Sequence, residues 1–182
     1  MERFVNSILP EVPGCSSYAI KQAVLRTAIL FCQDSWIWQL TAEKTIEANE
    51  STLTLSTAIM SQIADCYLFD ANDDLYKNFT RSKTIVTLYE AATADTDFNT
   101  ISFLKPTETA TALPDILYNE WFSGIEAGAK KRLQVQANKP WYNEKLAAYN
   151  DSVYQTEYHK AIVAARRTGE FKEFAIVRDT DY

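Results

Sequence analysis

The stretch of sequence that decides the fold covers residues 113–169, and it opens with LPDILYNEWFSGIEAGAKKRLQ. Pro114 suits the first turn of a helix, because the backbone N–H that proline lacks has no partner there. Leu117, Trp121 and Ile125 follow at intervals of four residues, which places them on one stripe of a helix. The pattern therefore predicts a helix that is buried along this stripe.

Two of the four glycines of the chain, Gly124 and Gly128, lie one turn apart in this predicted helix. A glycine inside a helix costs up to about 1 kcal/mol relative to alanine. The pair therefore indicates a close contact with another backbone that offsets this cost. The alternative is that the two glycines occur there by accident.

The segment Lys139-Pro140-Trp141 ends this helix, because the residue before a proline is driven out of the α region. Asn143 is a good N-cap, and Glu144 follows it at the positive end of the helix dipole. A further helix is therefore predicted over 143–168, with Gly169 placed to end it. The two helices form an antiparallel hairpin with a short aromatic connection.

The N-terminal part of the chain contains two prolines and a glycine in residues 1–16, which predict an extended arm. Ser16 or Ser17 then caps a helix over 17–40. This helix is apolar on more than one side. We therefore expect it to be buried on more than one side, either at the centre of the molecule or against a neighbouring subunit.

The middle of the chain is rich in β-branched residues that alternate with others, as in strands. Strands are predicted at 45–48, 52–55, 63–70, 75–79 and 98–104. Residues 84–89 are either a strand or the start of a short helix.

The order of these elements predicts an α+β fold that forms a single domain over 1–182. We expect an antiparallel helical bundle of three main helices with a small inserted antiparallel β-sheet and extended N- and C-terminal arms. The predicted main helices are 17–40, 114–136 and 143–168. The predicted parts are an N-terminal arm (1–16), the helical bundle (17–42 and 111–168), the inserted β region (43–110) and a C-terminal docking arm (169–182).

Two ordered sets of residues, one toward each end of the chain, carry a resemblance to a known family. The first set is LPEVPGC at 9–15 and FCQDSWIW at 31–38, and the second is LPD at 113–115, Trp121, Gly124, AGA at 127–129, Leu133 and KPW at 139–141. Together they resemble the head–tail adaptor (connector) proteins of tailed bacteriophages, over roughly residues 7–42 and 111–168. The middle of the chain resembles that family only in its position and its β character.

The resemblance implies a structural virion protein of the phage neck, made in the host cytoplasm. Such a protein docks on the portal as a homo-oligomeric ring, expected to have twelve subunits. The ring extends the DNA channel and provides the attachment surface for the tail or the next neck protein. Residues assigned to subunit packing are Trp36, Trp38, Trp121, Gly124, Gly128 and Trp141.

The last segment of the sequence, 170–182, is apolar and aromatic before it becomes polar. Such a segment can add a strand to the edge of a partner's sheet or insert into a groove. Residues assigned to docking on the portal or another partner are Phe171, Phe174, Ile176, Val177 and Tyr182. The alternative is that the segment packs back on its own domain.

The net charge of −6 is concentrated in the middle, since residues 43–115 hold twelve acidic and five basic side chains. This argues against a protein that grips nucleic acid by neutralising phosphates, which requires a basic face. In an adaptor ring, an acidic wall would repel phosphates and let DNA pass without sticking.

The sequence carries no pattern typical of an active site, a phosphate-binding loop or a cofactor site. Its one histidine, His159, has no recognisable nucleophile beside it, and Cys15, Cys32 and Cys66 fit no zinc pattern. We therefore predict no catalytic activity, no metal and no cofactor. No apolar run reaches the roughly 18 residues that a membrane span needs, so no membrane partner is predicted.

Three other functions are compatible with the same residues. One is a tail-completion or tail-tube-end protein of the same particle. Another is a cytoplasmic helical protein-binding module that docks an amphipathic partner helix. A small enzyme ranks behind both, because the sequence offers little reactive chemistry.

Overall fold

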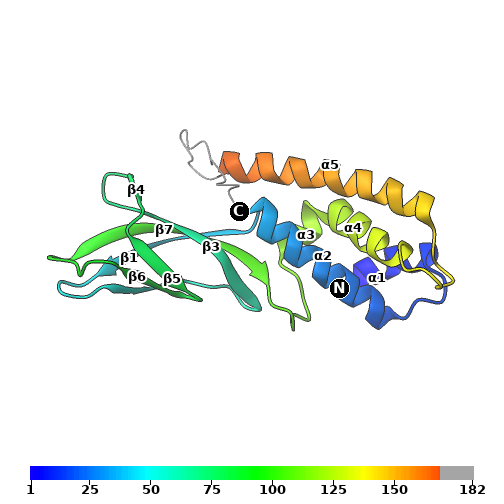
Figure 1. Ribbon diagram of the computed structural model, residues 1–182, viewed down its shortest axis with the longest axis horizontal. Coiled ribbons are helices and arrows are strands. Elements are labelled where there is room, and N and C mark those ends of the chain that lie inside the picture. Colours follow the sequence, from blue (N-terminus) through cyan, green and yellow to red (C-terminus); the bar gives the residue numbers. More distant parts are fainter. Residues whose placement is uncertain (169–182) are drawn as a thin grey trace.

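The computed structural model describes residues 1–168, which form a helical body and a β body along the long axis of the molecule (Figure 1). The helices are α1 (Glu2–Ile8), the short 3-10 helix η1 (Leu9–Glu11), α2 (Ser17–Ser35), α3 (Asp115–Asn119), α4 (Phe122–Gln134) and α5 (Glu144–Thr168). The strands are β1 (Gln39–Ile46), β2 (Thr52–Thr54), β3 (Ser61–Phe69), β4 (Leu75–Tyr76), β5 (Phe79–Ser82), β6 (Ile85–Leu88) and β7 (Thr96–Pro106).

The predicted fold, a three-helix bundle with a small inserted sheet, is wrong. Within residues 1–168 the structure has five α-helices and seven strands, and the strands form two antiparallel sheets. One sheet has the order β1-β7-β3-β4, and the other has the order β2-β6-β5. The two sheets contribute apolar side chains to one shared core. The larger sheet also buries Phe103 on its opposite face, where the ring packs on Trp36 at the end of α2.

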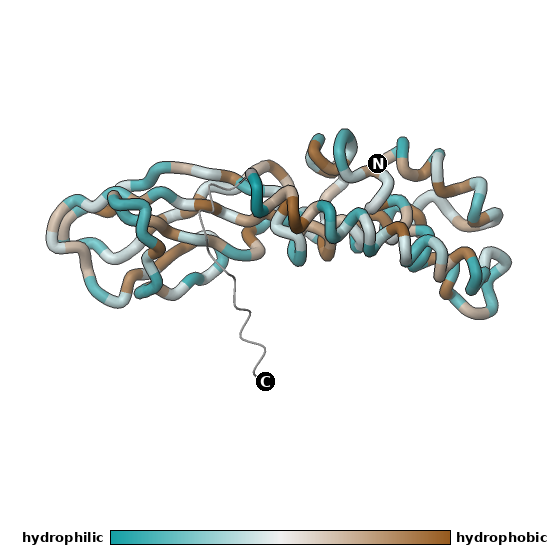
Figure 2. The backbone as a smooth tube through the Cα atoms, turned by 90° about the horizontal axis from the view of Figure 1, so that it is seen from above, coloured by the Kyte–Doolittle hydropathy of each residue, from teal (hydrophilic) through white to brown (hydrophobic). Residues whose placement is uncertain are grey.

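The core of the β body contains side chains from both sheets, such as Leu53 and Val86 from the smaller and Leu68 and Phe98 from the larger. Figure 2 shows that hydrophobic residues recur along the strands and the helices.

The ambiguous segment 84–89 is a strand, β6. It pairs with both β2 and β5, and these pairings settle what its short sequence left open.

The first residues of the chain form a helix, so the predicted extended arm over 1–16 is wrong. Phe4, Val5 and Ile8 lie on one side of α1, and all three are buried in the core of the helical body. The two prolines and the glycine of this segment, which disfavour a helix, lie after α1 ends. Leu9–Glu11 forms one 3-10 turn with proline near its start, and the turn to α2 follows.

The first long helix, α2, starts as predicted and ends earlier. The Ser16 side chain accepts a hydrogen bond from the backbone N–H of Ala19 at 3.2 Å, which is the expected cap. The helix ends at Ser35 because Trp36 adopts the left-handed conformation, with φ at 58°. Strand β1 begins three residues later, so the chain passes almost directly from the helical body to the β body.

The predicted helix over 114–136 is two helices, α3 and α4, separated at Glu120 and Trp121. Trp121 leaves helical geometry, with φ at −116° and ψ at 18°, and its side chain is buried in the core. The helix predicted over 143–168 is confirmed as α5, and Asn143 Oδ1 accepts a hydrogen bond from the N–H of Leu146 at 3.1 Å. Gly169, which was predicted to end it, lies outside the described residues.

The two helical glycines lie where α4 meets its neighbours, as a close contact requires. A Cβ atom on Gly128 would lie 2.5 Å from Thr27 Cγ2 of α2 and 2.7 Å from Tyr154 Cδ2 of α5. A Cβ atom on Gly124 would lie 2.9 Å from Glu157 Cβ of α5. The contact is close, but it is made by side chains of α2 and α5 within one chain and not by another backbone as predicted.

Replacing Gly128 by alanine is expected to destabilise the protein by about 1–3 kcal/mol. The added methyl group overlaps both adjacent helices, and this strain exceeds the gain of up to about 1 kcal/mol in helix propensity. Urea unfolding of Gly128→Ala and of the control Ser123→Ala, at an exposed position near the start of α4, measures the difference. An alanine variant as stable as the native chain would contradict the contact.

Candidate interaction site

Trp36 and Trp38, assigned to subunit packing, lie at the joint between the two bodies. The Trp36 ring stacks on the buried ring of Phe103 in β7, with centroids 4.7 Å apart, and meets Tyr67 of β3 edge-on at 5.7 Å. Trp38 is half-buried and packs against the cores of both bodies. These two side chains therefore connect the bodies within one chain.

Trp121 and Trp141 lie in the helical body. Trp121 is buried, and its ring lies 5.8 Å from that of Phe31 in α2. Trp141 is half-buried in the connection between α4 and α5, where Lys139 Nζ lies 5.9 Å from the centre of its ring. The indole N–H groups of both tryptophans are buried and have no hydrogen-bond partner within residues 1–168.

The remaining site predictions are Gly124 and Gly128, and the docking residues of the C-terminal segment. Both glycines are buried, with Trp121, among the chain's own helices, which leaves little of their surface for a neighbouring copy. A role in subunit packing stays a prediction for Gly124, Gly128 and Trp121. The same holds for the three remaining tryptophans, which are Trp36, Trp38 and Trp141. The docking residues, which are Phe171, Phe174, Ile176, Val177 and Tyr182, lie outside the described residues.

Reactive groups do not gather at any point of residues 1–168. No group of three His, Cys, Asp or Glu side chains there could hold a metal ion. His159 is exposed on α5, and its Nδ1 lies 2.6 Å from the carbonyl oxygen of Gln155. Burial raises the pKa of the thiols of Cys15 and Cys32, and raises that of Cys66 to about 11, so these thiols stay protonated and unreactive at neutral pH.

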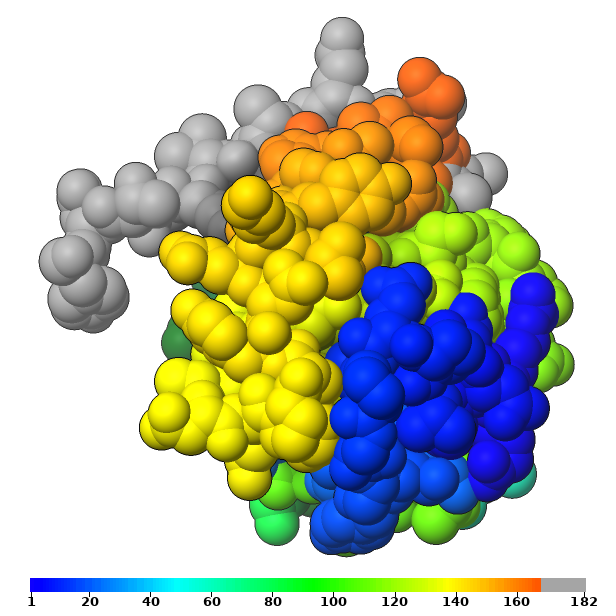
Figure 3. Space-filling model, turned by 90° about the vertical axis from the view of Figure 1, so that its right-hand side faces the viewer, coloured from blue at the N-terminus to red at the C-terminus, as the bar shows by residue number. Residues whose placement is uncertain are grey.

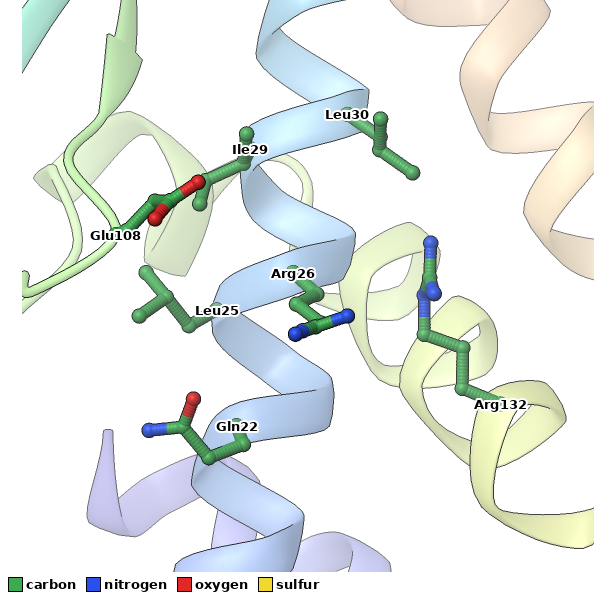
Figure 4. Close-up of a pocket in the computed structure, with 7 residues that line it drawn as sticks. All are labelled: Gln22, Leu25, Arg26, Ile29, Leu30, Glu108 and Arg132. Carbon is green, nitrogen blue, oxygen red and sulfur yellow. The ribbon is translucent and has the colours of Figure 1, made fainter. Parts of the chain in front are cut away.

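A groove of about 470 Å³ runs along α2, where the sequence singled out no residue. Figure 4 shows Arg26 and Leu30 of α2 and Arg132 of α4 pointing into the same space between the two helices. Neither arginine forms an ion pair with an acid of residues 1–168. Glu108 also lines the groove, so its lining combines two arginines, one carboxylate and apolar side chains.

An ion cluster ties the N-terminal turn to α4. Lys130 Nζ lies 2.6 Å from Glu11 Oε1 and 2.9 Å from Glu126 Oε1, and Ser7 donates a hydrogen bond to Glu126. Burial by itself lowers the pKa of Lys130, but the hydrogen bonds and charges of the two glutamates outweigh it and raise the pKa. The cluster therefore keeps a buried lysine charged, and its role is structural.

The end of the helical body, which consists of α1, η1 and residues 135–149, exposes large apolar side chains. Figure 3 faces this end and shows the N-terminal segment beside the connection from α4 to α5. The exposed residues in these segments are Leu9, Val135, Tyr142, Leu146 and Tyr149. Tyrosine is enriched at protein interfaces because its apolar ring carries a polar tip, so this helical end has the composition of a contact surface.

No protein-family model matches the chain, and no curated protein matches it. Within residues 1–168, no helix combines the length and the apolar character that a membrane crossing needs.

Lys130→Met is expected to lower the free energy of unfolding by about 1–3 kcal/mol, because it leaves Glu126 mostly buried without a countercharge. Lys131→Met is the matched control. Lys131 also forms an ion pair, with Asp151, but both side chains are more than a third exposed, so its loss should cost about 0–1 kcal/mol. If urea unfolding gave equal losses of the free energy of unfolding in Lys130→Met and Lys131→Met, the Lys130 cluster would contribute no more than a surface ion pair.

Tyr154→Phe is expected to change how stability depends on alkaline pH. Burial, and then the charge of Asp34, raises the pKa of Tyr154 to about 12 in the folded chain, from the usual value of about 10 when unfolded. The folded state therefore holds this proton more tightly. The contribution of the protonated Tyr154 hydroxyl to the free energy of unfolding is complete below about pH 10 and is lost as the pH rises toward about 12. Urea unfolding at pH 8 and at pH 11 measures how much of the free energy of unfolding is lost between them, and the loss should be smaller in Tyr154→Phe than in the native chain. Tyr149→Phe alters an exposed residue of the same helix, so it is the control and should behave like the native chain. Identical losses in all three would contradict this assignment.

Proposed function

We propose that the protein is a head–tail adaptor of a tailed bacteriophage. It is a structural virion protein of the neck that docks on the portal as a ring, extends the DNA channel and offers an attachment surface to the tail. The observation that carries this proposal is the packing of the chain's two ends. The stretches that carry the resemblance, 7–42 and 111–168, are far apart in sequence but supply most of one helical body.

The exposed surface supports a role in assembly. The helical end presents exposed apolar and aromatic side chains. A protein that buries surface against several copies of itself and against a portal needs such areas. The groove at Arg26 and Arg132, which Glu108 also lines, adds a site with charged and apolar side chains for a partner segment.

The charge of the β body supports a role beside moving DNA. Residues 39–106 hold ten acidic and five basic side chains, and many of the acids are exposed, such as Glu43, Glu47 and Asp73. A surface of this sign repels phosphates and gives no grip on a duplex. We propose that this body faces the DNA channel or the tail, while the helical body packs the subunits together.

The chemistry of residues 1–168 supports a structural role over an enzymatic one. The charged and polar groups that are most buried, around Lys130 and around Gln134 and Asn150, bind one another. None of them lines the groove along α2. An enzyme would need reactive groups together in a pocket.

Binding to the portal tests the proposal. The purified full chain is mixed with portal rings of the phage that encodes it, and the complex is examined by sedimentation and by electron microscopy. We expect the chain to sediment with the portal and to add a symmetric ring of density at one end. As a control, the rings are mixed with an unrelated acidic protein of similar size.

Three outcomes would contradict the adaptor role. Binding to tail tubes with no binding to portal would identify a tail-completion protein. Binding to neither, with capture of a helical peptide, would favour a helical binding module. Turnover of a small molecule that one substitution abolishes would identify an enzyme.

A further inference from the structure

The chain passes between the helical body and the β body only twice within residues 1–168. The first passage is residues 36–38, between α2 and β1, and the second is residues 107–114, between β7 and α3. In the first passage Trp36 has a positive φ of 58°, which a bulky residue adopts only where its surroundings enforce it. Because two short segments connect the bodies in this part of the chain, non-covalent contacts must set the angle between them.

Two helices end at this joint and present carbonyl groups to it. The last four carbonyl groups of a helix have no partner within that helix, and they form the negative end of its dipole. Trp36 is the residue that caps the end of α2, and Ala165 lies in the last turn of α5. The carbonyl oxygens of both residues therefore accept readily from donors outside their own helices.

One side chain of the β body supplies these donors. Gln39 is the first residue of β1, and its Nε2 atom donates to the carbonyl oxygen of Trp36 at 3.0 Å and to that of Ala165 at 3.1 Å. A glutamine amide nitrogen carries two N–H groups, so each carbonyl oxygen receives one of them. Gln39 therefore ties the first strand of the larger sheet to the ends of both α2 and α5.

A second polar contact and a hollow lie at the same joint. Lys105 of β7 donates to the Gln33 side chain in the last turn of α2 at 2.6 Å, and the negative end of a helix favours such an ammonium group. Both polar contacts therefore place donors on the β body and acceptors at the ends of helices. A hollow of about 360 Å³ lies beside them, lined by Gln39, by residues 37–38 and by residues 114–116. The hollow leaves space where both passages of the chain meet the bodies.

We propose that the joint is a hinge that bends at residues 36–38 and 107–114, and that Gln39 is the latch that holds it at one angle. While both hydrogen bonds of Gln39 are made, the ends of α2 and α5 keep fixed places against β1. When these bonds break, the bodies can turn about the contact between Trp36 and β7, and the hollow gives them room. This inference does not rest on the adaptor role, because it concerns the free chain alone.

Distances between two spin labels on the full chain test the proposal. One label is placed on each body, at the exposed positions Ser123→Cys of α4 and Thr80→Cys of β5, since the native cysteines are buried. We expect one narrow distribution of distances in this labelled protein. Gln39→Met keeps the length of the side chain but removes both donors, so it should make the distribution at least about twofold wider. Gln62→Met, at an exposed position of β3, is the matched control and should leave the distribution unchanged.

Three results would overturn the proposal. A distribution that stays narrow after Gln39→Met would show that other contacts set the angle. A wide distribution while Gln39 is present would show that nothing latches the joint. A changed distance after Gln39→Met between labels at Ser123→Cys and Thr156→Cys, both in the helical body, would show that Gln39 stabilises the helices instead. A wider distribution between the bodies, with that internal distance unchanged, supports the latch.

Discussion

The close approach of α4 to α2 and α5 is the contact on which the rest of the helical body depends. At Gly128 a single methyl group would overlap side chains of both neighbouring helices. The absence of a side chain lets α4 lie deep between them, and this position brings Phe31 and Trp121 together in the core. Because close-packed interiors do not tolerate extra volume, the two glycines determine how near the three helices come.

The joint between the two bodies is the second determinant of the molecule's shape. Trp36 ends α2 in a left-handed conformation and stacks its ring on Phe103 of β7. Lys105 of β7 donates a hydrogen bond to the Gln33 side chain at 2.6 Å, which adds a polar link beside the ring contact. The bodies are therefore joined by side-chain packing as well as by the chain itself.

The polar chemistry of the described residues stabilises the fold and provides surfaces for contact. The buried lysine of α4 is neutralised by two glutamates, and the cysteines are buried and protonated. Within residues 1–168, the indole N–H groups of Trp121 and Trp141 are buried without a partner. The arginines beside α2 and the aromatic side chains of the helical end lie at the surface. This distribution supports the proposed role in assembly.

Local patterns in the sequence determined most of the individual elements. Spacing of four residues identified α2, α5 and the helical region of α3 and α4, but not α1. Proline before Trp141 separated α4 from α5, and alternation located most of the strands. The need for a close contact at Gly124 and Gly128 was also evident, because glycine is costly inside a helix.

Only the tertiary structure decided how these elements combine. Alternation shows that a strand buries one face, but it does not show that two sheets bury their faces against each other, and the middle was therefore predicted as one small sheet. The helix at residues 2–8 is too short to be stable alone, and it forms because Phe4 and Ile8 pack against helices from distant parts of the chain. The groove between Arg26 and Arg132 brings together residues more than a hundred positions apart. Periodicity is a local property, whereas pairing of sheets and assembly of sites depend on contacts between distant residues.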